Sequence, residues 1–361
     1  MTNTELPSLK IGDLDINPPI IQGGMGVRVS RAGLAAAVAN EGCAGVIATV
    51  GLGRFEDHPG SRYRQVNGEG LRNEIRKARS MTEGILGVNV MVALTDYDNL
   101  ASIAAEAGVD LIIAGAGLPL DLPRFVAGKP TKLVPIVSSA RAFSIICRKW
   151  QRVYNRAPDA VVVEGVKAGG HLGFSYDEAA NGTAPALDAI LTEVLEVANA
   201  CQPPVPVIAA GGIFDGADIA RVLRLGAAGV QMATRFVCTH ECDVHPLFKQ
   251  AYLNAREGDI TIIRSPVGLP GRVLNSPFVE RVKRGETIPF KCSYRCLKTC
   301  DPHTVPYCIA KVLVNAAEGN MDQAFAFSGE NSYRIDRIVS VKELIAELVE
   351  QAGAHLHGDP V

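Results

Sequence analysis

Eight short aliphatic runs, each bounded by glycine, proline or polar residues, constrain the fold of this 361-residue chain more than any other feature. Most of the runs are continuously apolar, which is typical of strands buried on both faces of a parallel sheet. Stretches rich in Ala and Leu with helical spacing, such as Arg31–Asn40 and Gly216–Leu225, separate most of them. The runs are Pro19–Gly23, Ala44–Val50, Ile85–Met91, Val109–Ala114, Lys132–Val137, Asp159–Glu164, Val205–Ala210 and Gly229–Thr234.

This alternation of strands and helices predicts βαβ units, and eight such units close into a (β/α)8 barrel. An open, doubly wound sheet is the alternative, because the strand count alone does not separate the two folds. We expect the barrel to occupy residues 1–257. The βα pattern stops there, so residues 258–361 are expected to form a cysteine-containing C-terminal extension packed on the barrel.

Two gaps between strands are longer than a single helix requires, namely Arg54–Gly70 and His171–Pro185. Both follow the C-terminal end of a strand, where barrels build their active sites. We therefore interpret them as loops that face a substrate. For the first gap, a surface insertion is the alternative.

Composition excludes several classes of partner. The formal net charge is −2 and no basic stripe stands out, so nucleic-acid binding has no electrostatic support. No apolar run is long enough to span a bilayer, and the first twenty residues lack an apolar signal core. We expect a soluble, cytoplasmic protein that acts on a small-molecule substrate without a membrane partner. The sequence leaves a homodimer open.

Two glycine-containing or polar segments follow consecutive strands near the end of the barrel: Ala209–Ile213 and Gln231–Arg235. Gly211 and Gly212 let backbone N–H groups approach an anion without a Cβ in the way. Thr234 can add a hydroxyl donor. The last two strands of such barrels commonly carry a phosphate site in the loops that follow them. The glycines alone would fit ordinary tight turns, but the two segments together favour phosphate binding.

Five segments occur in an order that resembles the nitronate monooxygenase family, formerly called 2-nitropropane dioxygenases. They are Ile21–Gly26, Gly87–Met91, Glu164–Gly173, Ala209–Ile213 and Gln231–Phe236. The chain equally resembles the flavin-dependent enoyl-acyl carrier protein reductases of type II. The resemblance covers roughly residues 15–285, nearly the whole barrel. It implies a TIM barrel that binds FMN.

The resemblance also implies roles for individual residues. Ala233 departs from the family, whose members usually have glycine at this position. Residues expected beside the flavin ring are Gln22, Gly23, Gly24 and Met25, with Asn89 hydrogen-bonded to the flavin and Gly170 at its reacting edge. Residues expected to hold the phosphate are Gly211, Gly212, Ala233 and Thr234, and Gln231 and Glu164 complete the cofactor-binding set.

His171 is the candidate catalytic residue. Glycines on both sides leave its imidazole unshielded at a strand end, which suits a general acid or base near neutral pH. The motif around it, Ala168–Gly173 (AGGHLG), is closer to the enoyl-reductase version than to the nitronate version. Glu164 is the carboxylate at the end of the same strand. It either orients a flavin or substrate hydroxyl or remains a buried structural acid.

Four of the nine cysteines lie close together in the extension, at Cys292, Cys296, Cys300 and Cys308. On a helix the first three would share one face, and four thiolates suit iron–sulfur or zinc. The spacing is neither that of bacterial ferredoxins nor that of a zinc knuckle. We therefore favour reduced structural cysteines and keep an iron–sulfur cluster as the alternative.

These features favour an FMN-dependent oxidoreductase that oxidises a nitronate or a similar small substrate, with O2 reoxidising the flavin. One alternative is a reductase of enoyl-ACP or quinones fed by diffusible NAD(P)H, because no GxGxxG motif follows a strand to form a separate dinucleotide site. Another is a non-catalytic flavin or electron-relay subunit. A barrel without flavin that binds a phosphorylated metabolite is the last.

Overall fold

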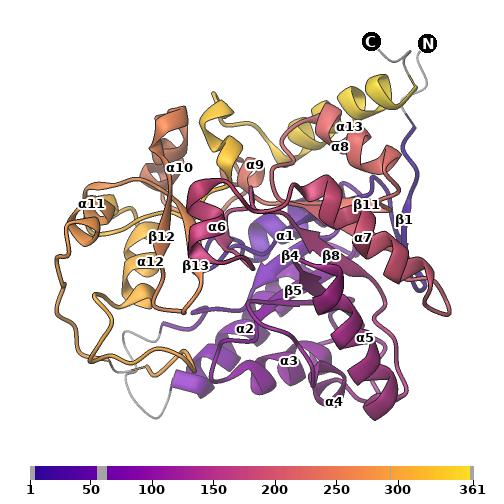
Figure 1. Ribbon diagram of the computed structural model, residues 1–361, viewed down its shortest axis with the longest axis horizontal. Coiled ribbons are helices and arrows are strands. Elements are labelled where there is room, and N and C mark those ends of the chain that lie inside the picture. The colour runs from indigo at the N-terminus through magenta and orange to yellow at the C-terminus, as the bar shows by residue number, and fades with distance from the viewer. Residues whose placement is uncertain (1–4, 55–62, 293, 358–361) are drawn as a thin grey trace.

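The computed structural model describes residues 5–54, 63–292 and 294–357, and a parallel barrel forms its centre (Figure 1). All eight expected strands are confirmed, and they form one sheet in the order β3-β11-β10-β8-β7-β6-β5-β4. A bridge between Ile21 and Ala44 joins its two edges and completes the barrel. The strands are β3 (Ile20–Gln22), β4 (Gly45–Ala48), β5 (Leu86–Met91), β6 (Leu111–Gly115), β7 (Lys132–Val137), β8 (Val161–Glu164), β10 (Val207–Ala210) and β11 (Gly229–Met232).

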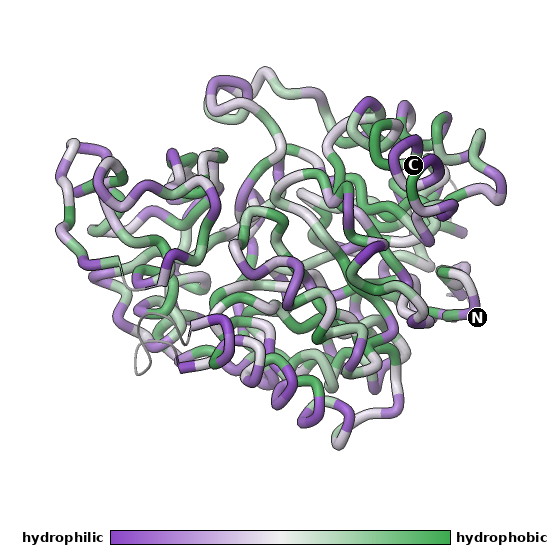
Figure 2. Tube along the Cα trace, turned by 90° about the horizontal axis from the view of Figure 1, so that it is seen from below, coloured by the Kyte–Doolittle hydropathy of each residue, from purple (hydrophilic) through white to green (hydrophobic). Residues whose placement is uncertain are grey.

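Helices follow each strand and cover the outside of the barrel. Their apolar residues face the strands, and Figure 2 shows hydrophobic strands running through the interior. Trp150 of α5 is fully buried, and its indole nitrogen donates to the Pro119 carbonyl at 3.0 Å. The helices are α1 (Ala32–Asn40), α2 (Tyr63–Arg79), α3 (Tyr97–Glu106), α4 (Leu122–Phe125), α5 (Ala140–Tyr154), α6 (Tyr176–Asn181), α7 (Leu187–Asn199), α8 (Gly216–Arg224) and α9 (Thr234–Val237).

The barrel strands are buried on both faces, as their unbroken apolar sequences predict. In β6, for example, Leu111 and Ile113 belong to the cluster inside the barrel, while Ile112 and Ala114 belong to the cluster under the helices. The hairpin of β1 (Leu9–Ile11) and β2 (Leu14–Ile16) adds its apolar residues to the inner cluster. It therefore closes the amino-terminal end of the barrel and leaves the opposite end open for a site.

The C-terminal extension packs on the barrel and contains a hairpin that the sequence did not reveal. Strand β13 pairs with both β12 and β9, so that residues from the extension and from a barrel loop share one antiparallel sheet. Helix α13 lies against α8 (Figure 1). The elements are β9 (Gly170–His171), α10 (Pro246–Leu253), β12 (Ile260–Arg264), β13 (Pro270–Leu274), α11 (Pro277–Lys283), α12 (Ile309–Ala317) and α13 (Val341–His357).

The two gaps expected to face a substrate contain regular secondary structure. The gap Arg54–Gly70 is not a continuous loop, because α2 already includes Tyr63; residues 55–62 lie outside the described part of the chain. The gap His171–Pro185 contains β9 and α6. Among the described residues, no helix is both long and apolar enough to cross a membrane.

The cysteine segment is also not helical. Between Cys292 and Cys300 the described residues form no helix, and Leu297 makes an isolated bridge with Leu94. The Thr95 N–H donates to the Cys296 carbonyl at 3.0 Å. These contacts with the loop after β5 hold the segment in a non-helical conformation, so the expected common helical face of Cys292, Cys296 and Cys300 does not form.

Candidate active site

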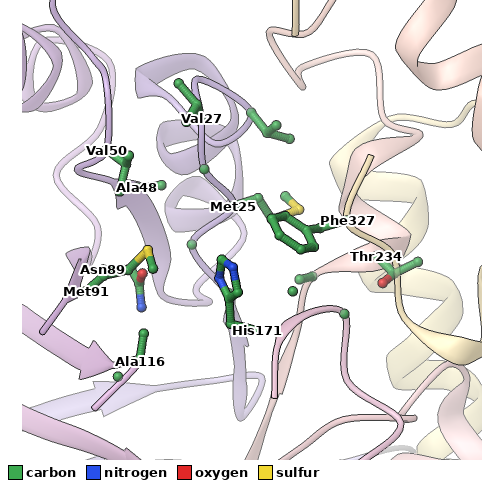
Figure 3. A pocket seen from close by; sticks show the side chains of 18 of the residues that line it. Met25, Val27, Ala48, Val50, Asn89, Met91, Ala116, His171, Thr234 and Phe327 are labelled. Carbon is green, nitrogen blue, oxygen red and sulfur yellow. The ribbon is translucent and has the colours of Figure 1, made fainter. Parts of the chain in front are cut away.

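Two adjoining pockets open at the carboxyl ends of the barrel strands, and they bring together nearly all the residues expected at a cofactor site. The first contains Gly23, Gly24, Met25, Asn89, Gly170 and His171. The second contains Gly211 and Gly212, and both share Glu164, Gln231, Ala233 and Thr234. In Figure 3, His171 lies in the middle of the first pocket, with Asn89 and Met91 on one side and Phe327 and Thr234 on the other.

The loop after β3 forms one wall of the first pocket and requires glycine. A Cβ at Gly24 would lie 2.4 Å from the Cβ of Asn89, so no larger residue fits without movement. The Ser30 hydroxyl accepts a hydrogen bond from the Met25 N–H at 2.8 Å and closes the loop. Gln22 does not line either pocket. Its fully buried side chain accepts from Val46 N at 3.1 Å and thereby supports the loop from below.

The second pocket requires glycine at two positions of its lining. Gly211 and Gly212 adopt φ values of +91° and +85°, which L-residues with a Cβ rarely tolerate. A Cβ at Gly211 would also lie 2.7 Å from the Gly165 carbonyl oxygen. Thr234 also lines the pocket, and its hydroxyl accepts a hydrogen bond from the Gly329 N–H at 3.1 Å.

Residues of the extension complete this second pocket. The sequence did not predict this contribution. Gly329, Glu330 and Asn331 line it, and the Asn331 side chain donates to the Gly212 carbonyl at 2.7 Å. Lys167 also lines it, and its ammonium lies 3.0 Å from the Glu330 carboxylate. The only advance signal was a second glycine-containing turn, Gly329 followed by two polar residues, in the tail.

Two polar groups lie where the pockets meet, the Gln231 Oε1 atom and the Glu164 carboxyl, and neither has a hydrogen-bond partner among the described residues. The buried Gln231 Oε1 has no hydrogen bond within the described part of the chain. Glu164 makes no hydrogen bond or ion pair with any described residue, and burial raises the pKa of its carboxyl to about 8. Buried polar groups are normally paired, so the Gln231 Oε1 atom and the Glu164 carboxyl are suited to a polar ligand that spans both pockets.

Replacing Glu164 by glutamine is expected to change how the stability of the ligand-free protein depends on pH. The folded pKa is raised, so the unfolded chain releases this proton first and stability falls as pH rises from about 4.5 towards about 8. Glu164→Gln removes this contribution. Denaturant unfolding at about pH 5 and about pH 8 should therefore show a smaller loss for the variant. An equal loss in both proteins would mean that Glu164 ionises normally.

His171 is held by contacts from the extension. It pairs with Gly271 across β9 and β13, and its Nε2 lies 2.8 Å from the Ser265 Oγ. The Phe327 ring packs against the imidazole, with centroids 4.8 Å apart. Burial lowers the pKa of His171 to about 4, so the imidazole is neutral near neutral pH. The sequence pointed to His171 but not to Ser265 or Phe327.

The wall opposite the barrel is apolar and comes from the C-terminal part of the chain. Phe248, Tyr252, Leu313, Ala326 and Phe327 form it. The extension was expected only to pack on the barrel. It also supplies a hydrophobic surface that would face a bound substrate and exclude water from it.

Two of the four clustered cysteines, Cys296 and Cys308, pack beside this site. Cys296 and Cys308 pack with Val27 in one apolar cluster. Burial, with neighbouring thiols, raises the pKa of Cys296 to about 12, so this thiol is protonated in the metal-free protein. Within the described part of the chain, no three His, Cys, Asp or Glu side chains are arranged to hold a metal ion.

Comparison with known proteins decides the family. The family model described as nitronate monooxygenase matches residues 8–113 and 92–351, which is most of the chain. The chain belongs to the nitronate monooxygenase family. A probable nitronate monooxygenase from Bacillus subtilis is 25% identical over 371 aligned positions, which cover 93% of this chain and 96% of that protein.

Other relatives of this family member carry different names. A Rhodococcus jostii protein, (3aS,4S,5R,7aS)-5-hydroxy-7a-methyl-1-oxo-octahydro-1H-indene-4-carboxyl-CoA dehydrogenase, is 28% identical over 74% of this chain. The chain spans 65% of that relative, less than two thirds of its length. The structure of FabK from Thermotoga maritima is 28% identical, with a TM-score of 0.74 and 92% of each chain covered. These similarities place the protein among oxidoreductases with a TIM-barrel fold.

Proposed function

We propose that this protein is an FMN-dependent oxidoreductase that oxidises a nitronate or a similar small substrate and uses O2 to reoxidise its flavin. The observation that carries the proposal is the pair of adjoining pockets. A glycine-lined anion site lies next to a pocket that contains His171, and the unpartnered Glu164 and Gln231 lie between them. This order of features matches a phosphate, a polyhydroxyl chain and a ring.

The residues present fit FMN. The backbone at Gly211 and Gly212, with the Thr234 hydroxyl, would hold the phosphate, and Lys167 would offset its charge. Glu164 and Gln231 would meet the ribityl hydroxyls. Bound FMN would supply a two-electron acceptor beside the substrate.

The chain's own residues would bind and orient the substrate. Neutral His171 can hydrogen-bond a substrate oxygen without carrying charge into the pocket. The apolar wall that contains Phe327 and Leu313 would exclude water and strengthen that hydrogen bond. Asn89, whose side-chain nitrogen lies 3.4 Å from the Ile113 carbonyl, keeps its amide oxygen available to the ring side of the pocket.

The released cofactor is expected to be FMN and not FAD. The second pocket offers space for one phosphate between Gly211, Gly212 and Thr234, and Glu330 and Asn331 also line it. Heat denaturation of the purified protein followed by mass spectrometry of the supernatant identifies the cofactor. Release of FAD, or of no flavin at all, would contradict this assignment.

A reductase of enoyl thioesters is the second candidate, because the apolar wall from the extension is suited to an acyl chain. Anaerobic mixing separates the two functions. If the first is correct, ethyl nitronate bleaches the flavin absorbance and admission of air restores it. If NADPH bleaches the flavin and crotonyl-CoA restores it, while ethyl nitronate has no effect, the second function is correct.

A further inference from the structure

The orientation of His171 is set by the C-terminal extension rather than by the barrel on which the residue lies. Strand β13 of the extension pairs with it, Phe327 packs on its ring, and Ser265 bonds its Nε2. Ser265 follows β12 directly and is only 8% exposed. Its hydroxyl is therefore shielded from water and must find its partners in the protein.

The hydrogen bonds of Ser265 determine the direction of its bond to His171. The Val267 N–H lies 3.3 Å from the Ser265 Oγ, and a backbone N–H can only donate, so the oxygen accepts there. The only acceptor within reach of the Ser265 hydroxyl proton among the described residues is the His171 Nε2, at 2.8 Å. The Ser265 oxygen has a second lone pair, but only donation to Nε2 gives its shielded proton a partner, which favours Ser265 as the donor to the imidazole.

This direction fixes the tautomer. The imidazole of His171 is neutral near neutral pH, and a neutral imidazole carries one proton. If Nε2 accepts from Ser265, the proton lies on Nδ1. No described residue hydrogen-bonds His171 Nδ1, and the residue lines the first pocket (Figure 3). An N–H donor, and not a lone pair, is thus available to a ligand there.

We propose that Ser265 is a positioning residue that holds His171 as the Nδ1–H tautomer, so that His171 donates to a negatively charged substrate oxygen. This deepens the proposed function and rests on it only for the identity of that oxygen. A nitronate brings such an oxygen already charged. Removal of a substrate proton by Nδ1 is not available in this arrangement, because that nitrogen has no lone pair to accept it.

The test uses the flavin-loaded protein with 15N-labelled histidine. At neutral pH the 15N spectrum of the wild type should show His171 protonated at Nδ1, with the signal assigned by its absence in His171→Gln. Ser265→Ala should shift the signal towards the other tautomer, and Ser265→Thr, which keeps the hydroxyl, should restore it. A wild-type His171 protonated at Nε2 would overturn the proposal, whether or not Ser265→Ala folds well.

Kinetics with ethyl nitronate add a second readout. Ser265→Ala should lower kcat by about 10- to 100-fold, the scale for a misplaced catalytic group, with unchanged flavin content and recovery in Ser265→Thr. Ser276→Ala is the matched control. Its hydroxyl also makes two hydrogen bonds, to Val279 N and to the Ala324 carbonyl, but it lines neither pocket. An equal kcat loss in both alanine variants would overturn the positioning role. If nitronate is not a substrate, only the kinetic readout is lost, and the 15N spectrum of His171 still tests the proposed tautomer.

Discussion

Gly211→Asp is expected to produce a folded protein that contains almost no flavin. The backbone at this position has a φ of +91°, and an added Cβ would meet the Gly165 carbonyl oxygen at 2.7 Å. The new carboxylate would also lie against the proposed phosphate and repel it. Loss of several charge-assisted hydrogen bonds, each contributing about 1.5–3 kcal/mol, would weaken FMN binding by about 10³-fold or more. The ratio of flavin absorbance to protein absorbance measures this loss.

A control variant must separate the backbone strain of placing Asp at a positive φ from the loss of flavin binding. Gly128 has a φ of +74° and open space around the position of a Cβ, and it lies in the loop before β7, at the amino-terminal end of the barrel. Gly128→Asp should therefore show the cost of the backbone conformation without the loss of flavin. Stoichiometric flavin in a well-folded Gly211→Asp protein would show that the anion site lies elsewhere.

His171→Ala is expected to retain FMN and to lose turnover by about 10²-fold or more, the usual scale for an acid or base residue or a positioned donor. Flavin binding should survive because the residues around Gly211 and the loop at Gly24 remain intact. The pH profile adds a specific test. Since burial lowers the pKa of His171 to about 4, the wild-type rate should be flat near neutral pH and change only on approach to that value.

His303 provides the matched control for this substitution, because its side chain is exposed and it lines neither pocket. Turnover of His303→Ala should equal that of the wild type. If the wild type turns over ethyl nitronate and His171→Ala does so at the same rate, His171 has only a structural role.

The barrel could be predicted from the sequence because strands and helices are specified by local patterns of residues. Most strands are unbroken aliphatic runs such as Lys132–Val137, and a helix follows each strand before the next one begins. The same local logic located Gly211, Gly212 and His171, since glycines and polar residues at strand ends face the open end of a barrel. These residues do line the pockets.

The contribution of the extension to the pockets could not be predicted from local patterns. Pairing between His171 and Gly271 joins residues 100 positions apart, and no local pattern specifies such a register. The bond between Ser265 and His171 and the position of Asn331 beside Gly212 depend on that pairing and on the fold of the tail. The cysteine segment illustrates the reverse error. Its four-residue spacing suggested a helix, but tertiary contacts with the loop at Thr95 hold it in an irregular conformation.

The central claim is that the two pockets together bind FMN through its phosphate. The most direct test is to titrate the apo-protein with FMN and with riboflavin and to measure binding by the quenching of flavin fluorescence. The two ligands share the ring and the polyhydroxyl chain and differ only in the phosphate. Riboflavin should bind about 100-fold or more weakly than FMN, because it lacks charged hydrogen bonds that each contribute about 1.5–3 kcal/mol. Equal affinity for the two ligands, or binding of neither, would contradict it.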